Sequence, residues 1–169
     1  MTSLDPRATP TPGLTLQAVL PLAISGGKES EDLIRAQTLL KSLGAAIEPS
    51  QKLVVNVVGR AGELDSIRAA LEPLASSSLA LKYHDEVELL PELAGSMISG
   101  WYKQQIIKLS PAEWLDADWW LILDADVVCV RRFAIEDLVP FGRPLARMID
   151  AKGAPLIGAW QRSTAQVLG

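Results

Sequence analysis

KLVVNVV, residues 52–58, is a run of mostly β-branched side chains that ends at Gly59. Continuous apolar runs of this length are typical of a strand that is buried on both faces, as in a parallel sheet between two layers of helices. The run therefore predicts the centre of an α/β domain, and the sequence on either side of it should alternate between helix and strand.

Strand and helix patterns do alternate on both sides of this run. The apolar stretch before it is broken by Ser25-Gly26-Gly27, and the helical spacing that follows ends at Gly44, where a C-cap is expected. This order favours a mostly parallel sheet flanked by helices. The predicted strands cover residues 14–24, 52–58, 79–84, 119–123, 127–130 and 142–148, and the predicted helices cover residues 29–43, 63–74 and 100–109.

Length and composition fit one domain of ordinary size. We expect residues 1–13, which are rich in proline, to form a flexible lead-in to a domain at residues 14–169. A net charge of -4 gives no basis for sequence-independent binding to nucleic acid. No signal peptide or transmembrane segment is visible, and the single cysteine, Cys129, is expected to be a small buried side chain in a reducing compartment. These features favour a cytoplasmic protein.

Polar residues follow the predicted strands. Residues 25–28, Gly59 with Arg60, residues 84–86 and residues 124–126 each stand at a strand end. In open parallel sheets, ligands bind beyond the carboxyl ends of the strands, near the point where the strand order reverses. These four groups are therefore expected at one edge of the sheet, and that edge is the predicted binding site.

Asp124-Ala125-Asp126 lies between two apolar runs, WWLIL and VVCV. Carboxylates in such surroundings need compensation, because burying a charge is costly. If the backbone is extended, Asp124 and Asp126 point to the same side and can converge on Mg²⁺ or Mn²⁺, leaving positions for phosphate oxygens. Such a cation would neutralise a leaving diphosphate. The alternative is a surface turn in which both aspartates cap loop amides.

Residues 100–109, GWYKQQIIKL, form the second informative segment. Trp101, Gln105 and Lys108 share one helical face, and the adjoining face is expected to contact the core through Tyr102, Ile106, Ile107 and Leu109. Lys103, Gln104 and Lys108 then remain for polar contacts, with lysine balancing a diphosphate and glutamine amides holding a ribose or base. The alternative is the solvated face of an ordinary amphipathic helix.

Other polar and aromatic residues have simpler interpretations. His84 is expected to be structural, and Asp85, Glu86 and Glu88 are expected in a solvated loop. The tryptophans Trp101, Trp114 and Trp119 are expected to pack in the core. Neither a Gly-x-Ser-x-Gly motif nor a cysteine–histidine pairing signal is present, which disfavours hydrolases.

The run GWYKQQIIKL, followed by WWLILDADVVCVRRF and GRPL, resembles the central block of bacterial glycosyltransferase-like proteins with a GT-A fold. In that block a Gly-Trp-Tyr-(Arg/Lys)-Gln-Gln helix precedes a Leu-Asp-(Ala/Ser)-Asp strand end. The match covers residues 100–145, and it is similar, more distantly, to the retaining galactosyltransferase and glycogenin-like group. Arg131-Arg132-Phe133 stands where the block usually has Arg-Pro-Phe.

This resemblance implies a GT-A-like, Rossmann-like fold that lacks the C-terminal acceptor half. It also implies transfer of a sugar from a nucleoside diphosphate sugar to an unknown saccharide, lipid or protein acceptor. Asp124 and Asp126 would hold Mn²⁺ or Mg²⁺, and no catalytic residue is assigned. The residues implied to contact the nucleotide are Ala23, Ile24, Ser25, Lys28, Lys103, Gln104, Asp124 and Ala125.

Two other functions remain open from the sequence. The chain can be a non-catalytic module, derived from a truncated glycosyltransferase, that binds a nucleotide-sugar or a partner protein. It can also be a Rossmann-like regulatory or phosphotransfer domain that uses the acidic sheet edge for Mg²⁺.

Overall fold

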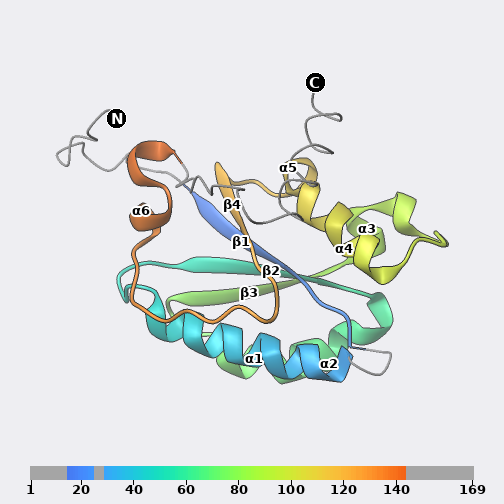
Figure 1. The fold of residues 1–169 in the computed structure, drawn as a ribbon, viewed down its shortest axis with the longest axis horizontal. Coiled ribbons are helices and arrows are strands. Elements are labelled where there is room, and N and C mark those ends of the chain that lie inside the picture. The colour runs from blue at the N-terminus through green and yellow to red at the C-terminus, as the bar shows by residue number, and fades with distance from the viewer. Residues whose placement is uncertain (1–14, 25–28, 144–169) are drawn as a thin grey trace, which may run out of the picture.

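The computed structural model describes residues 15–24 and 29–143. Within them, four strands form one parallel sheet in the order β3-β2-β1-β4 (Figure 1). The sheet confirms the predicted α/β class, and each strand lies where the sequence pattern predicted one. The strands are β1 (Leu16–Pro21), β2 (Leu53–Gly59), β3 (Leu79–Asp85) and β4 (Trp119–Ile122).

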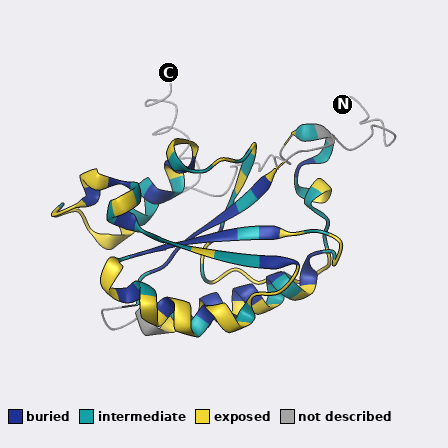
Figure 2. Ribbon diagram, turned by 180° about the vertical axis from the view of Figure 1, so that it is seen from behind, coloured by how far each residue is buried: buried dark blue, intermediate teal, exposed yellow. Residues whose placement is uncertain are grey.

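Helices cover both faces of this sheet (Figure 1). The long α1 (Glu29–Ala46) and α2 (Ala61–Leu71) lie on one face, and α4 (Gly100–Leu109) lies on the other. Figure 2 shows that the central strands β1 and β2 are mostly buried between these two layers, whereas the edge strands β3 and β4 are mostly of intermediate burial. The shorter helices are η1 (Glu72–Leu74), α3 (Glu86–Leu89), η2 (Pro91–Leu93), α5 (Pro111–Trp114), α6 (Ile135–Leu138) and η3 (Pro140–Gly142).

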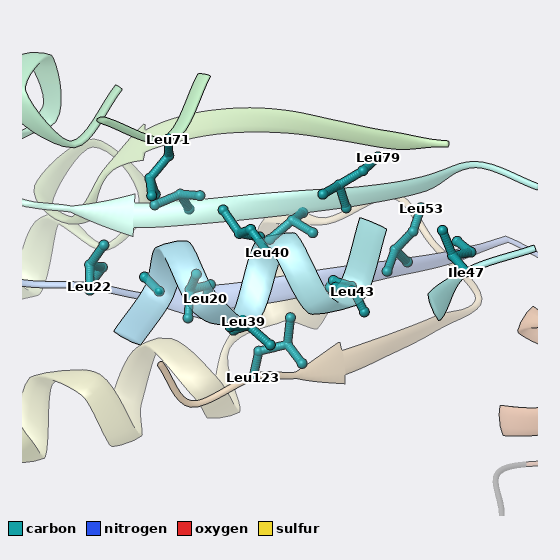
Figure 3. Close-up of a cluster of buried hydrophobic side chains, with 14 of the residues drawn as sticks. Leu20, Leu22, Leu39, Leu40, Leu43, Ile47, Leu53, Leu71, Leu79 and Leu123 are labelled. Atoms are coloured by element: carbon teal, nitrogen blue, oxygen red, sulfur yellow. The ribbon is translucent and has the colours of Figure 1, made fainter. Parts of the chain in front are cut away.

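Two apolar clusters hold the layers together, one on each face of the sheet. Successive side chains of a strand point to opposite faces, so Leu20 packs with α1 and α2, whereas Val19 packs with Ile107 of α4. Figure 3 shows Leu39, Leu40 and other side chains of the larger cluster between α1 and the strands. Burial on both faces explains why β2 is apolar apart from Asn56 and its final Gly59.

The first helix is longer than predicted. It does not end at Gly44 but continues to Ala46. The additional turn buries Ala46, and the next residue, Ile47, is buried and bridges Phe133. Tertiary packing of this kind outweighs the roughly 1 kcal/mol by which glycine disfavours a helix interior.

The strand predicted at residues 127–130 is absent from the structure. After β4 the chain turns, with Val127 N–H donating to the carbonyl of Asp124 at 3.2 Å. It then runs to the C-terminal end of α1, where Cys129 N–H donates to Ser42 Oγ at 3.0 Å. The Cys129 N–H, which a strand would pair with a neighbouring strand, therefore binds a side chain of α1 instead. Of the strand predicted at residues 142–148, the residues from 144 onward lie outside the described part of the chain.

The inward face of α4 also differs from the prediction. Ile107 is 2% exposed, whereas Tyr102 and Leu109, expected in the core, are 60% and 84% exposed. At 3.6 residues per turn, Tyr102 and Leu109 lie about 140° and 160° around the helix from Ile107. The same rotation leaves Trp101 exposed, which corrects its predicted place in the core, while Trp114 and Trp119 are partly buried as predicted.

None of the helices formed by the described residues combines the length and the apolar character that crossing a bilayer requires.

Candidate functional site

The strand order reverses between β1 and β4. The sheet extends from β1 through β2 to β3 on one side, and the chain then crosses to place β4 on the other side of β1. Backbone pairing continues to both strand ends, since Leu22 N–H donates to Val58 and Leu123 N–H donates to Val19, each at 2.9 Å. The carboxyl ends of β1 and β4 therefore flank a switch point, where ligands of α/β proteins bind.

A cleft of about 580 Å³ opens at this switch point, and we name it the carboxylate cleft. Asp124 and Asp126 both line it, together with the predicted residues Gln104 and Ala125. Helix α4 contributes a face with the spacing i, i+3, i+4 and i+7. The full lining consists of Pro21, Leu22, Asp32, Arg35, Trp101, Gln104, Gln105, Lys108, Asp124, Ala125 and Asp126.

The two aspartates reach this cleft from a turn. The extended backbone predicted at residues 124–126 was wrong, because the chain forms a turn there. Asp124 and Asp126 nevertheless line the same cleft. No amide of a described loop donates to either carboxylate, so the alternative in which they cap such amides is not observed. Instead, Asp124 Oδ1 accepts a hydrogen bond from Lys108 Nζ of α4.

Lys108 was expected to be free for polar contacts, but it was not among the residues implied to contact the nucleotide. Its side chain is 14% exposed, while that of Asp124 is 60% exposed. The ion pair links α4 to the turn after β4 across the layers of the fold. The spacing of Trp101, Gln104, Gln105 and Lys108 on one helix face was the available signal, but the face that meets the cleft depends on how α4 is rotated.

Lys103, the basic residue predicted to contact the nucleotide, lies elsewhere. Its Nζ is 3.7 Å from Glu86 Oε1 and donates to the carbonyl of Leu93 at 3.4 Å. Glu86 is 9% exposed, and Asp85 caps α3 by accepting from Val87 N–H at 2.9 Å. These two carboxylates are therefore structural parts of the α3 region, not members of a solvated loop.

A second, smaller cleft of about 260 Å³ adjoins the first, and we name it the adjoining cleft. Lys103 and Ala23 line it, so these two predicted residues lie at the sheet edge but away from Asp124. Its walls are Pro21, Leu22, Ala23, Asp32, Val58, Arg60, Glu86, Gly100, Trp101, Lys103, Gln104 and Ile107. Five of these residues also line the carboxylate cleft: Pro21, Leu22, Asp32, Trp101 and Gln104.

The remaining predicted residues follow β1. Ile24 packs against the core, and its N–H donates to Glu63 Oε2 at 2.8 Å. Glu63 is 8% exposed and also pairs with Arg60 Nη1 at 3.0 Å, which ties the end of β1 to the start of α2. Ser25 and Lys28 lie outside the described residues.

The donor set in the carboxylate cleft suits a cation that arrives with its substrate. Among the described residues, no group of three or more histidine, cysteine, aspartate or glutamate side chains gathers into a metal site. Mg²⁺ commonly binds through one or two carboxylates and takes its other ligands from substrate phosphates and water. Asp124 and Asp126 can supply the protein's share of such a site.

His84 belongs to the interior rather than to either cleft. Its Nε2 donates to Asn56 Oδ1 at 3.0 Å, and its ring lies 5.6 Å from that of Trp114. Asn56 in turn donates to Gln17 Oε1 and to the Ala18 carbonyl. Burial lowers the pKa of His84, and the nearby charge of Lys82 lowers it further. This agrees with the structural role predicted for the histidine.

Comparison with known proteins adds three findings. A family model described as "Family of unknown function (DUF6492)" matches residues 14–169. None of the curated proteins matches the chain. The crystal structure of mouse xyloside xylosyltransferase 1 in its apo form is similar over 59% of this chain and 37% of that one, with 21% identity and a TM-score of 0.36. The chain thus spans little more than a third of that transferase, and a likeness this distant says nothing about its function.

Proposed function

The chain belongs to the DUF6492 family, whose function is unknown, and we propose that it binds a nucleoside diphosphate sugar together with Mn²⁺ or Mg²⁺ and transfers the sugar to an acceptor. The observation that carries this proposal is the composition of the carboxylate cleft. Three carboxylates, Asp32, Asp124 and Asp126, line one opening at the switch point of a parallel sheet, together with the cations Arg35 and Lys108. Asp32 pairs with Arg35, which leaves Asp124, Asp126 and Lys108 as the charged group at the end of β4. This combination suits a diphosphate with a divalent cation.

Each charged group has a distinct role in this proposal. Asp124 and Asp126 hold the cation, which neutralises the diphosphate and acts as a Lewis acid when bound. Lys108 Nζ, now paired with Asp124, donates to phosphate oxygens of the bound diphosphate. Arg35 of α1 lines the same cleft, where it pairs with Asp32 at 2.9 Å and with Glu31 at 3.1 Å, so its charge is largely compensated. A protein of net charge -4 needs such local positive groups to hold an anionic ligand.

The neutral residues of the cleft suit the sugar and the ribose. Gln104 and Gln105 line the opening between Trp101 and Lys108. Amide side chains both donate and accept hydrogen bonds, as recognition of hydroxyl groups requires. The resemblance of residues 100–145 to GT-A glycosyltransferases supports the same ligand class, and the acceptor stays a saccharide, lipid or protein of unspecified identity.

Calorimetry tests the binding step. UDP, GDP, ADP and CDP are titrated into the protein with Mn²⁺, and at least one is expected to bind. Asp126→Ala should abolish this binding, because the cation loses one of its two carboxylates. Asp65→Ala removes an exposed aspartate of α2 that lies away from both clefts, and it should bind like the wild type. Equal affinity of wild type and Asp126→Ala would refute the proposal.

Turnover is measured separately. Nucleotide-sugars that carry the base of the tightest diphosphate are incubated with the protein and Mn²⁺, with and without added saccharides. Release of the nucleoside diphosphate by the wild type, lost in Asp126→Ala, is expected for a transferase. Metal-dependent binding without any release would identify the non-catalytic nucleotide-sugar module instead.

A further inference from the structure

Trp101 is a large aromatic side chain that the fold leaves exposed. Its exposed fraction is 63%, although it stands in the first turn of a helix that packs on the sheet. The ring is edge-on to that of Tyr102, with the centroids 4.9 Å apart and an interplanar angle of 79°. Exposed apolar surface beside a cleft marks binding sites, and an aromatic ring held by a neighbour is a prepared contact surface.

Trp101 also stands where the two clefts meet, since it lines both of them. Lys108, at the carboxylate end, follows it by seven residues on the same face of α4. Two turns of helix separate these positions by about 10 Å. In an extended nucleoside diphosphate, the base lies about this far from the terminal phosphate, whereas the transferred sugar is bonded to that phosphate and lies close to it.

The adjoining cleft has the surfaces that a flat heteroaromatic ring needs. Pro21, Leu22 and Ala23 supply apolar contacts from the end of β1. Gly100 also lines the cleft, and a Cβ there would make only ordinary van der Waals contact with Arg60 Nη2, at 3.6 Å. Gln104, which lines both clefts, can pair with polar groups of a base or ribose. The charged side chains of Asp32, Arg60, Glu86 and Lys103 are part of the lining as well. The cleft therefore offers both apolar walls and polar groups, as pockets for small ligands do.

We infer that Trp101 forms the stacking wall of a nucleobase subsite in the adjoining cleft. The inference rests on the proposed function and extends it: the diphosphate occupies the carboxylate cleft, and the base turns past Gln104 against the indole ring. The sugar then remains in the larger cleft, where an acceptor can reach it. Affinity for the nucleotide comes in part from the aromatic ring, separately from the cation.

The test compares a ligand with a base and a ligand without one. A nucleoside diphosphate from the panel above and inorganic pyrophosphate are each titrated with Mg²⁺ into wild type, Trp101→Ala and Trp101→Phe. Trp101→Ala should weaken binding of the nucleoside diphosphate by about 5- to 150-fold, the range for loss of one base–aromatic stack. It should leave pyrophosphate affinity unchanged, and Trp101→Phe should recover most of the loss.

Leu109→Ala is the matched control, because Leu109 is an exposed apolar residue of α4 that lines neither cleft. It should bind both ligands like the wild type. Equal weakening of both ligands by Trp101→Ala, or no weakening of either, overturns the inference. The inference is also overturned if the wild type binds pyrophosphate as tightly as every nucleoside diphosphate. That result would leave the proposed binding of a diphosphate with a cation standing. If neither ligand binds the wild type, the proposed function fails as well.

Discussion

Replacement of Gly59 by alanine should destabilise the protein at the carboxyl ends of β1 and β2, next to the two clefts. Gly59 is the last residue of β2. A Cβ placed there would lie 3.1 Å from Ile67 Cδ1, 3.2 Å from the Leu22 carbonyl oxygen and 3.3 Å from Leu64 Cδ2. The side-chain atoms can move, but the carbonyl belongs to backbone held by the hydrogen bond from Leu22 N–H to Val58. The strain therefore falls on the end of β1.

The net cost follows from two opposing effects. Overpacking a well-packed site costs about 1–3 kcal/mol. Replacing glycine by alanine restricts the unfolded chain and recovers roughly 0.4–1 kcal/mol. The difference of the two ranges is about 0–2.6 kcal/mol, centred on about 1.3 kcal/mol. A fall of about 1.3 kcal/mol in the free energy of unfolding lowers the Tm by roughly 3–5 °C for a domain of this size. Since Leu22 lines both clefts, affinity for the nucleoside diphosphate should fall too.

Urea denaturation followed by circular dichroism measures the loss, and Gly62→Ala is its control. Gly62 lies in the first turn of α2, and a Cβ there would meet nothing within 4 Å. Alanine at that position should leave stability unchanged or raise it by up to about 1 kcal/mol. If Gly59→Ala is as stable as Gly62→Ala, the close approach of β2 to the end of β1 is not a constraint on this fold.

Three further predictions concern single side chains. Ile107→Ala should lower the free energy of unfolding by about 2–5 kcal/mol in urea denaturation, because Ile107 is buried in the apolar cluster between α4 and the sheet. Leu109→Ala should change it by less than about 0.5 kcal/mol, because Leu109 is exposed. Equal effects of the two variants would contradict the observed rotation of α4. Lys108→Met should weaken Mg²⁺-dependent pyrophosphate binding about tenfold in calorimetry. It should change the free energy of unfolding by no more than about 1 kcal/mol, because its partner Asp124 is largely exposed. Unchanged pyrophosphate affinity would exclude Lys108 from the anion site. The pKa of His84 is lowered in the folded state, so the unfolded chain binds a proton at this residue more readily. The contribution of neutral His84 to the free energy of unfolding should therefore be fully present above about pH 6.5 and decline as the pH falls below that value. Urea denaturation of His84→Gln should show a shallower decline below that pH, and an unaltered pH profile would contradict the burial of the ring.

Much of the architecture was predictable because its signals are local. The apolar run of β2 and the spacing of α4 each reflect the environment of a few consecutive residues. The bounds of α4 were predicted to the residue, and the four strands, α1 and α2 differ from the prediction by a few residues at their ends. The short helices α3, η2, α6 and η3 were not predicted, and η3 includes Gly142, where a strand was expected to begin. The strand expected at residues 127–130 was wrong. Of that apolar run only Cys129 packs against the core, while Val127, Val128 and Val130 are exposed, so apolar character there did not reflect burial in the sheet.

The site was predicted in part for the same reason. Asp124, Ala125 and Asp126 follow shortly after β4, so the strand pattern was enough to place them at the carboxyl edge of the sheet, where they line the carboxylate cleft. Lys103 and Lys108 could not be ranked in this way, because both lie on α4 and both can bind an anion. Their roles differ because Lys103 pairs with Glu86 in the adjoining cleft and Lys108 pairs with Asp124.

What the amino-acid sequence determined by itself is the series of elements and the carboxylates at the end of the last strand, because strand and helix periodicity arise from neighbouring residues. The tertiary structure alone decided the order β3-β2-β1-β4, the rotation of α4 about Ile107 and the pairing of Lys108 with Asp124. Each of these depends on which surfaces bury one another, and residues far apart in the chain meet only when the two helical layers close on the sheet.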